Sequence, residues 1–332
     1  MKKILLLFFI VLLLNPFNIT FASTQKNKNL NKDEYTFIPS ISTRSWNIDK
    51  LINKYNIKNN YGKGVNIAII DSGIDKNHSD FKKFKFKENR SFIPGEQDTS
   101  DRIGHGTSIA GEISQLSPGA TFNIYKAYSK DKSSMNDIAT AIIYAVKHNN
   151  NIINLSFGSV ANTHSSSDIR SIRELQKAIN YAHSKNVIVV AAAGNEGKNY
   201  EALKKEGYKY IPGDLENVIT VGSISEDDTV VLPYSNQGKS VELLGYGGGS
   251  NAPREKYKIE DLLLLPYPQN LDNHLTVIGL NQGYTLTYGT SLSCAETSAM
   301  IANDISLKKH NTKYWTSEKY KKDYIFSKHI RL

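Results

Sequence analysis

One serine lies where a glycine turn meets the start of a predicted helix, in the stretch Gly289-Thr290-Ser291-Leu292-Ser293-Cys294-Ala295-Glu296. The residues that follow include few helix breakers, so the stretch predicts a helix that begins near Ser291. At such a position the hydroxyl lies near unpaired backbone N–H groups and the positive end of the helix dipole. Most serines there only cap a helix. Ser291 therefore indicates a nucleophile only if a base and an acid accompany it.

Residues that fit the roles of base, acid and oxyanion donor occur at other predicted turns. Asp71 follows an apolar run, His105 lies between two glycines, and Asn195 follows a further glycine. A serine that hydrolyses peptides needs a base to take its proton, a carboxylate to orient that base, and donors for the oxyanion. His105 fits the first role, Asp71 the second, and Asn195 with the backbone N–H of Ser291 the third. Each residue alone is an ordinary turn or helix-start residue; together they predict an active site.

The elements that would hold these residues follow an α/β pattern. Nearly continuous apolar runs alternate with amphipathic helical patterns, which predicts a parallel sheet covered by helices on both faces. Functional side chains in such a sheet gather where strands end. The predicted strands are Val65–Ile70, Phe122–Tyr128, Ile152–Phe157, Val187–Ala193, Val218–Ile224 and Val241–Leu244. One predicted helix buries Ile138, Ile142, Ala145 and Val146, and another buries Ile169, Ile172, Leu175, Ile179 and Ala182.

Four short blocks carry a family resemblance: Asp71-Ser72-Gly73, Gly104-His105-Gly106-Thr107, Ala192-Ala193-Gly194-Asn195 and Gly289-Thr290-Ser291. They resemble the signature blocks of subtilisin-like serine proteases, and their order Asp, His, Ser is that of subtilisin. The resemblance extends from about residue 46 to residue 304. It implies a three-layer α/β fold with a central, mostly parallel sheet and helices on both faces. It also implies a serine endopeptidase with the triad Asp71, His105 and Ser291 and the oxyanion residue Asn195.

The resemblance further implies where a peptide substrate would bind. One wall of the S1 pocket, which holds the side chain before the scissile bond, would be formed by Ser156, Phe157 and Gly158. The other wall would be formed by Ala192, Ala193 and Gly194, with Glu196 near the rim. The segment Ile211-Pro212-Gly213 resembles a family turn that often contains a cis proline.

Within the family, the chain looks most like the lantibiotic leader peptidases of Gram-positive bacteria. The similar features are Thr290-Ser291-Leu292, the stretch Gly245–Gly249 and the long segment 250–288. This resemblance implies a protease that processes the leader or pro-peptide of a bacterial peptide. A broad extracellular degradative protease and a toxin-like processing protease are the alternatives within the enzyme class. A catalytically dead protease kept as a peptide-binding module is the alternative from another class.

The sequence departs from the family pattern at two places. After Ser291 the family usually shows Ala, then Ser or Thr, then Pro, whereas Ser293, Cys294 and Ala295 stand here, so the nucleophile helix begins differently. Cys294 is the single cysteine, which excludes an internal disulfide and a cysteine-based zinc site. We expect it to be buried one helical turn after Ser291, where a thiol reagent would displace the nucleophile and inhibit. The loop that often builds a calcium site after Gly111 is missing, so we predict no metal and no other cofactor.

The two ends of the chain differ in composition from the body. Two lysines, the apolar run Ile4–Leu14 and the site Thr20-Phe21-Ala22 predict a signal peptide over residues 1–22. The run is too short for a permanent membrane span, although an uncleaved anchor is the alternative. Residues 23–45 predict a linker or short pro-segment, and residues 46–332 a peptidase domain with a basic C-terminal tail. We therefore expect a secreted or envelope-associated protein of a Gram-positive type.

The formal net charge of +9 is concentrated at the ends. Ile305–Leu332 contains eight Lys and Arg residues against two acidic ones, and the body between the ends is almost neutral. A nucleic-acid groove would need basic charge spread through the body, so this partner class is excluded. The basic tail is suited to weak contact with an anionic cell envelope, with solvation of a last helix as the alternative. The expected partner is a peptide or protein substrate, and we expect a monomer.

Overall fold

The computed structural model describes residues 45–130 and 132–317, so the predicted signal peptide, most of the linker and the last part of the basic tail lie outside the described residues. Its centre is a seven-stranded sheet in the order β2-β3-β1-β4-β6-β8-β9, in which every neighbouring pair is parallel. The predicted parallel α/β architecture is confirmed. The strands are β1 (Asn66–Asp71), β2 (Lys85–Ser91), β3 (Thr121–Lys126), β4 (Ile152–Leu155), β6 (Ile188–Ala192), β8 (Ile219–Ile224) and β9 (Val241–Tyr246).

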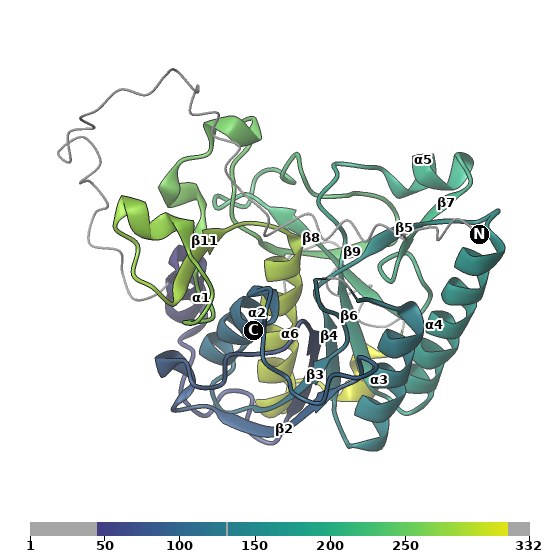
Figure 1. Ribbon diagram of the computed structural model, residues 1–332, viewed down its shortest axis with the longest axis horizontal. Coiled ribbons are helices and arrows are strands. Elements are labelled where there is room, and N and C mark those ends of the chain that lie inside the picture. The colour runs from purple at the N-terminus through teal and green to yellow at the C-terminus, as the bar shows by residue number, and fades with distance from the viewer. Residues whose placement is uncertain (1–44, 131, 318–332) are drawn as a thin grey trace.

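Helices cover both faces of the sheet (Figure 1). One face carries α3 (Met135–Lys147) and α4 (Ser166–Ser184), which pack on each other over an apolar cluster. The other face carries α1 (Trp46–Tyr55), α2 (His105–Leu116) and α6 (Thr290–Ser306). The remaining elements are α5 (Tyr200–Lys205), α7 (Thr312–Trp315), β5 (Ser159–Asn162), β7 (Tyr208–Ile211), β10 (Leu263–Pro266), β11 (Tyr284–Thr287) and the 3-10 turns Ser79–Phe81, Arg254–Lys256, Ile259–Asp261 and His274–Ile278.

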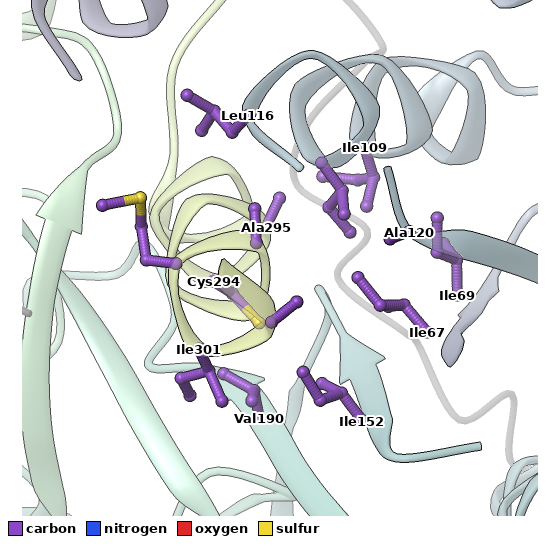
Figure 2. Packing of buried hydrophobic residues seen from close by; sticks show 14 of the residues in the cluster. Ile67, Ile69, Ile109, Leu116, Ala120, Ile152, Val190, Cys294, Ala295 and Ile301 are labelled. Carbon is purple, nitrogen blue, oxygen red and sulfur yellow. The ribbon is translucent and has the colours of Figure 1, made fainter. Parts of the chain in front are cut away.

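Helix α6 lies inside the core instead of on the surface. It packs against β4, β6, β8 and β9 and against α2, and residues 290–304 are all buried. Figure 2 shows Cys294, Ala295 and Ile301 of this helix among apolar side chains of β4, β6 and α2. Small residues such as Ala295 and Ala299 let the helix lie close to its neighbours, because no long side chain holds the backbones apart.

Three sequence-based expectations differ from the structure in detail. The strand predicted over Ile152–Phe157 ends at Leu155, because Ser156 turns away and donates a hydrogen bond to the Ser291 carbonyl (2.8 Å). Ile169 is exposed and not buried, because the first turn of α4 lies beside β5, where Asp168 accepts a bond from the backbone of Asn162 (2.9 Å). Edge strand β2 was not predicted, since its charged sequence lacks an apolar run.

The segment 250–288 adds a hairpin, β10–β11, beside helix α2. The hydroxyl of Ser108 donates to the Pro266 carbonyl (2.8 Å), and the backbone N–H of Leu264 donates to the Ser45 hydroxyl (3.2 Å). Within residues 45–130 and 132–317, no helix combines the length and the apolar character needed to cross a bilayer.

Candidate active site

Asp71 and His105 meet at the point where the strand order of the sheet reverses. Asp71 is the last residue of β1, whose neighbours β3 and β4 continue the sheet in opposite directions. Ligands of open α/β sheets bind in the crevice at such a switch point. His105 begins α2, and its Nδ1 lies 2.8 Å from Oδ1 and 3.0 Å from Oδ2 of Asp71. This pairing places the proton on Nδ1 and leaves Nε2 for a nucleophile.

The environment of this pair raises the pKa of His105. Burial works against the charged form of His105, but the charge of Asp71 and its hydrogen bond outweigh burial and raise the pKa of the imidazole. The carboxylate of Asp71 is fully buried, and it accepts further hydrogen bonds from the backbone N–H of Ser72 (2.7 Å) and from the hydroxyl of Tyr128 (2.8 Å). The side chain of His105 is 12% exposed, which leaves the imidazole open to a substrate.

A second buried carboxylate, Asp101, holds the start of α2 in place. It accepts hydrogen bonds from the backbone N–H groups of Gly104 (2.8 Å) and Thr107 (2.9 Å) and from the Thr107 hydroxyl (2.7 Å). The Ser72 hydroxyl donates to the same carboxylate (2.9 Å), which ties the loop after β1 to the helix. A Cβ at Gly106 would lie 2.2 Å from the Gly73 carbonyl oxygen, so only glycine allows this approach.

Ser291 is the second residue of α6, and its backbone is held by a buried polar network. Its carbonyl oxygen accepts the bond from the Ser156 hydroxyl, which in turn accepts from Asn154 Nδ2 (2.9 Å). The Oδ1 of Asn154 accepts from the Cys294 thiol (3.3 Å) and the Ser298 hydroxyl (2.9 Å). Although the family proline is missing, α6 begins at Thr290 and holds Ser291 in its first turn.

The amide of Asn195 is oriented by the residue before the serine. Its Oδ1 accepts hydrogen bonds from the backbone N–H (2.8 Å) and the hydroxyl (3.1 Å) of Thr290. The NH₂ group is therefore the end of the amide that Thr290 does not engage. A Cβ built on Gly289 would lie 3.2 Å from Asn195 Nδ2 and 3.3 Å from Ser291 Oγ, so these two polar atoms border the same small space. A substrate carbonyl placed there would meet both.

The two predicted pocket walls follow β4 and β6, which are hydrogen-bonded neighbours in the sheet. Residues 156–158 come directly after β4, and Ala192, Ala193 and Gly194 close β6. Glu196 is exposed as a whole residue, but its carboxylate accepts a 2.6 Å hydrogen bond from Asn236 Nδ2, and desolvation raises its pKa. The predicted cis peptide bond between Ile211 and Pro212 is confirmed.

Four residues around the site escaped the sequence analysis: Tyr128, Asp101, Tyr210 and Asn236. The position of Asp101, four residues before His105, was the available signal, since a carboxylate just before a helix typically caps its first turn. In the part of the chain that the structure describes, no group of three or more His, Cys, Asp and Glu side chains is arranged to hold a metal ion.

A family comparison matches this arrangement. The model of the subtilase family, Peptidase S8, matches residues 62–328. The chain belongs to the subtilase family. Subtilases are serine proteases, so this chain is a serine endopeptidase and its chemistry is the hydrolysis of peptide bonds.

Among subtilases, similar chains include proteases with narrow tasks. The chain is 30% identical to the epidermin leader peptide-processing serine protease EpiP of Staphylococcus epidermidis, over 85% of this chain and 69% of that protein. It is 28% identical to the nisin leader peptide-processing serine protease NisP of Lactococcus lactis, over 72% of this chain but only 40% of that protein. A crystal structure of a lanthipeptide protease superposes with a TM-score of 0.74 at 30% identity, covering 82% of this chain and 84% of the other.

Proposed function

We propose that this protein removes the leader from the precursor of a lanthipeptide outside the cell. The observation that carries the proposal is the similarity to EpiP, whose name gives it this task, over 85% of the chain at 30% identity. The crystal structure of a lanthipeptide protease, with its TM-score of 0.74, supports the same reading. The expected partner is therefore a peptide with a leader, and not a nucleic acid.

In the proposed mechanism, His105 Nε2 takes the proton of the Ser291 hydroxyl as the oxygen attacks the scissile carbonyl. Asp71 keeps the imidazole in the required tautomer and stabilises its charge. The amide of Asn195 and the backbone N–H of Ser291 bind the oxyanion of the tetrahedral intermediate. His105 then protonates the leaving amine, and water hydrolyses the acyl-enzyme. The bond from Nδ1 to Asp71 (2.8 Å) and the bonds that fix Asn195 Oδ1 support these roles.

The proposal includes an extracellular location and a chain with a single peptidase domain. Residues 1–22 would be a signal peptide, residues 23–45 a linker or short pro-segment, and residues 46–332 the peptidase domain, acting as a monomer. The basic residues of the tail would give weak contact with an anionic cell envelope. The two lysines before the apolar run support the signal peptide, and the basic residues of Ile305–Leu332 support the envelope contact.

The test is cleavage of a panel of lanthipeptide precursors by the purified protein, followed by mass spectrometry. We expect one cut, at the junction of leader and core, and no digestion of unfolded casein. Ser291→Ala should lose about 10⁴-fold of kcat/KM or more, a magnitude taken from triad deletions in the related subtilisin. Many cuts in casein would identify a degradative protease instead. Failure of a fluorophosphonate probe to label Ser291 would indicate a peptide-binding module without catalysis.

A further inference from the structure

The ring of Tyr210 lies between the two predicted walls of the S1 pocket. A Cβ built on Gly158, in the first wall, would lie 2.4 Å from Tyr210 Cε1. A Cβ built on Gly194, in the second wall, would lie 2.4 Å from Cζ and 2.5 Å from the hydroxyl oxygen of the same ring. The outer end of one aromatic side chain therefore touches both glycines, and it occupies the space that a long substrate side chain would need.

We infer that Tyr210 closes the S1 pocket and limits the residue before the scissile bond, P1, to small uncharged side chains: glycine, alanine or serine. The inference rests on the proposed function for the direction in which the peptide binds. It assigns the class of cleavage site, a property that the names of the relatives do not state.

The ring is held in place from behind. Tyr210 is 4% exposed and belongs to β7, where it pairs with Val160 of β5. It stacks on Tyr200, with ring centroids 5.7 Å apart and planes 21° apart. The hydroxyl of Tyr200 is fixed in turn, because it donates to the Ala193 carbonyl (2.7 Å). Packed interiors have little vacant volume, so the ring has no room to swing aside for a larger P1 side chain.

The acidic residue at the rim does not provide a site for a basic P1 side chain. Glu196 is the group that would attract arginine or lysine there. Its carboxylate is already engaged by Asn236 Nδ2 at 2.6 Å, and the same nitrogen lies 2.9 Å from the Ala193 carbonyl oxygen. The positive charge of Arg254 also acts on this carboxylate. An arginine at P1 would have to pass the Tyr210 ring and displace these partners, at the cost of their hydrogen bonds.

The experiment measures kcat/KM for three peptides that differ only at P1, which is alanine, phenylalanine or arginine. The wild-type protein should cleave the alanine peptide at least about 10-fold better than the other two, since pocket fit commonly discriminates by 10-fold or more. Tyr210→Ala should open the pocket and raise the ratio of phenylalanine to alanine cleavage by about 10-fold. Tyr210→Phe keeps the ring and should keep the wild-type ratio. Tyr208→Ala, on the same strand but exposed, is the matched control and should also leave the ratio unchanged.

A fluorophosphonate probe separates failure of the inference from failure of the proposed function. The probe reports the reactive serine without a P1 side chain. If Ser291 is labelled but the wild-type protein prefers phenylalanine or arginine, the inference is wrong and the peptidase stands. If Ser291 is not labelled and no peptide is cut, the proposed function fails, and the inference fails with it. The P1 preference of the wild-type protein tests the inference even if Tyr210→Ala does not fold.

Discussion

The hydroxyl of Tyr128 reaches Asp71 and His105 from outside the proposed triad. It donates to Asp71 Oδ1 (2.8 Å), and the same oxygen lies 3.1 Å from His105 Nδ1. Burial, followed by the charge of Asp71, raises the tyrosine pKa well above 10, so the hydroxyl stays protonated and remains a donor. Its ring contacts Phe157 edge-on, with centroids 5.5 Å apart. Tyr128 therefore takes up part of the negative charge that Asp71 would otherwise direct at the imidazole.

Tyr128→Phe should raise the pKa of His105 further, since the removed hydrogen bond leaves more of the Asp71 charge to stabilise the imidazolium. In the proposed mechanism the neutral imidazole is the base, so the acid limb of kcat/KM should move to higher pH. A hydrogen bond of about 1 kcal/mol corresponds to about 0.7 pH unit. The measurement is the pH profile of kcat/KM from pH 5 to 9. Tyr125→Phe is the control, since that buried hydroxyl donates to Glu88 (3.0 Å) instead of to the triad. A uniform loss of activity with an unmoved limb would mean that Tyr128 only supports packing.

At the residue scale, the sequence predicts the candidate catalytic residues better than the side chains that surround them. Asp71 and His105 stand in short glycine-rich blocks, and the structure brings their side chains together; their catalytic roles remain predictions. Tyr128 and Tyr210 gave no such signal. Tyr128 ends the predicted apolar strand Phe122–Tyr128, and Tyr210 lies in the mixed sequence of β7. An aromatic residue in either place is typical of a core. Which pocket a tyrosine side chain enters depends on its rotamer and on segments far away in the chain. The hydrophobic periodicity of the sequence predicts neither of these.

Among the elements, α6 carries both the proposed nucleophile, Ser291, and the single cysteine of the sequence. The Cys294 side chain is fully buried, its thiol donates to Asn154, and burial raises its pKa to about 12. The thiolate is the reactive form of cysteine, and here almost none of it forms. The buried position of Cys294 one turn after Ser291 is confirmed. The inhibition by thiol reagents expected from the sequence stays a prediction, and burial of the thiol should make that inhibition slow.

Native protein should react with a thiol reagent such as DTNB only as fast as α6 leaves the core, and it should remain active for as long as the thiol is unlabelled. Urea above the unfolding midpoint should give one label per chain. Cys294→Ser should remain active, because a hydroxyl also donates to Asn154. It should stay unlabelled under both conditions, because it has no thiol. Asn154→Ala, by contrast, removes the acceptor of two donors and should destabilise by about 1–3 kcal/mol. Rapid stoichiometric labelling of the folded protein would contradict the buried position.

Most elements were predictable, and the exceptions share a cause. The six predicted strands are present because strands buried on both faces read as continuous apolar runs. Strand β2 is charged and lies at an edge. Strands β5, β7, β10 and β11 have four residues each and lie outside the central sheet, whereas the equally short β4 was predicted because it is buried and lies inside that sheet. The early end of β4 depends on the bond from Ser156 to Ser291, two residues 135 positions apart in the chain.

At the scale of the whole molecule, two buried carboxyl groups lie on the helices that carry the proposed base, His105, and the proposed nucleophile, Ser291. Glu112 of α2 and Glu296 of α6 are both buried, and desolvation raises the pKa of each. For Glu112 the value reaches about 8, although Asn47 of α1 donates to it (2.6 Å) and opposes the shift. The backbone N–H of Tyr246 donates to Glu296 (2.9 Å). The native protein therefore holds protons that an unfolded chain releases near pH 4.5.

This proton binding predicts stability that falls as the pH rises. Below pH 4.5 the raised pKa of Glu112 contributes its full stabilisation to the folded state. Between pH 4.5 and about pH 8 the free energy of unfolding falls by about 1.4 kcal/mol per pH unit, and above pH 8 the loss levels off. Glu112→Gln is neutral at every pH, so it should flatten this slope and unfold at a higher temperature than wild type at pH 8–9. Thermal unfolding measured from pH 5 to 9 tests this. Glu174→Gln, an exposed residue of α4, should leave the slope unchanged. Equal slopes for wild type and Glu112→Gln would place the proton uptake elsewhere.

The central position of α6 has a consequence for the order in which the protein is made. The helix fills a space bounded by β4, β6, β8, β9 and α2, all of which precede it in the chain. About 190 residues separate His105 from Ser291, and a ribosome adds them in about 10–40 s at typical rates of synthesis. Throughout that interval the growing chain contains the proposed base and acid but not the proposed nucleophile. If Ser291 is the nucleophile, a cell that makes this protease is thus spared its activity until α6 has been synthesised.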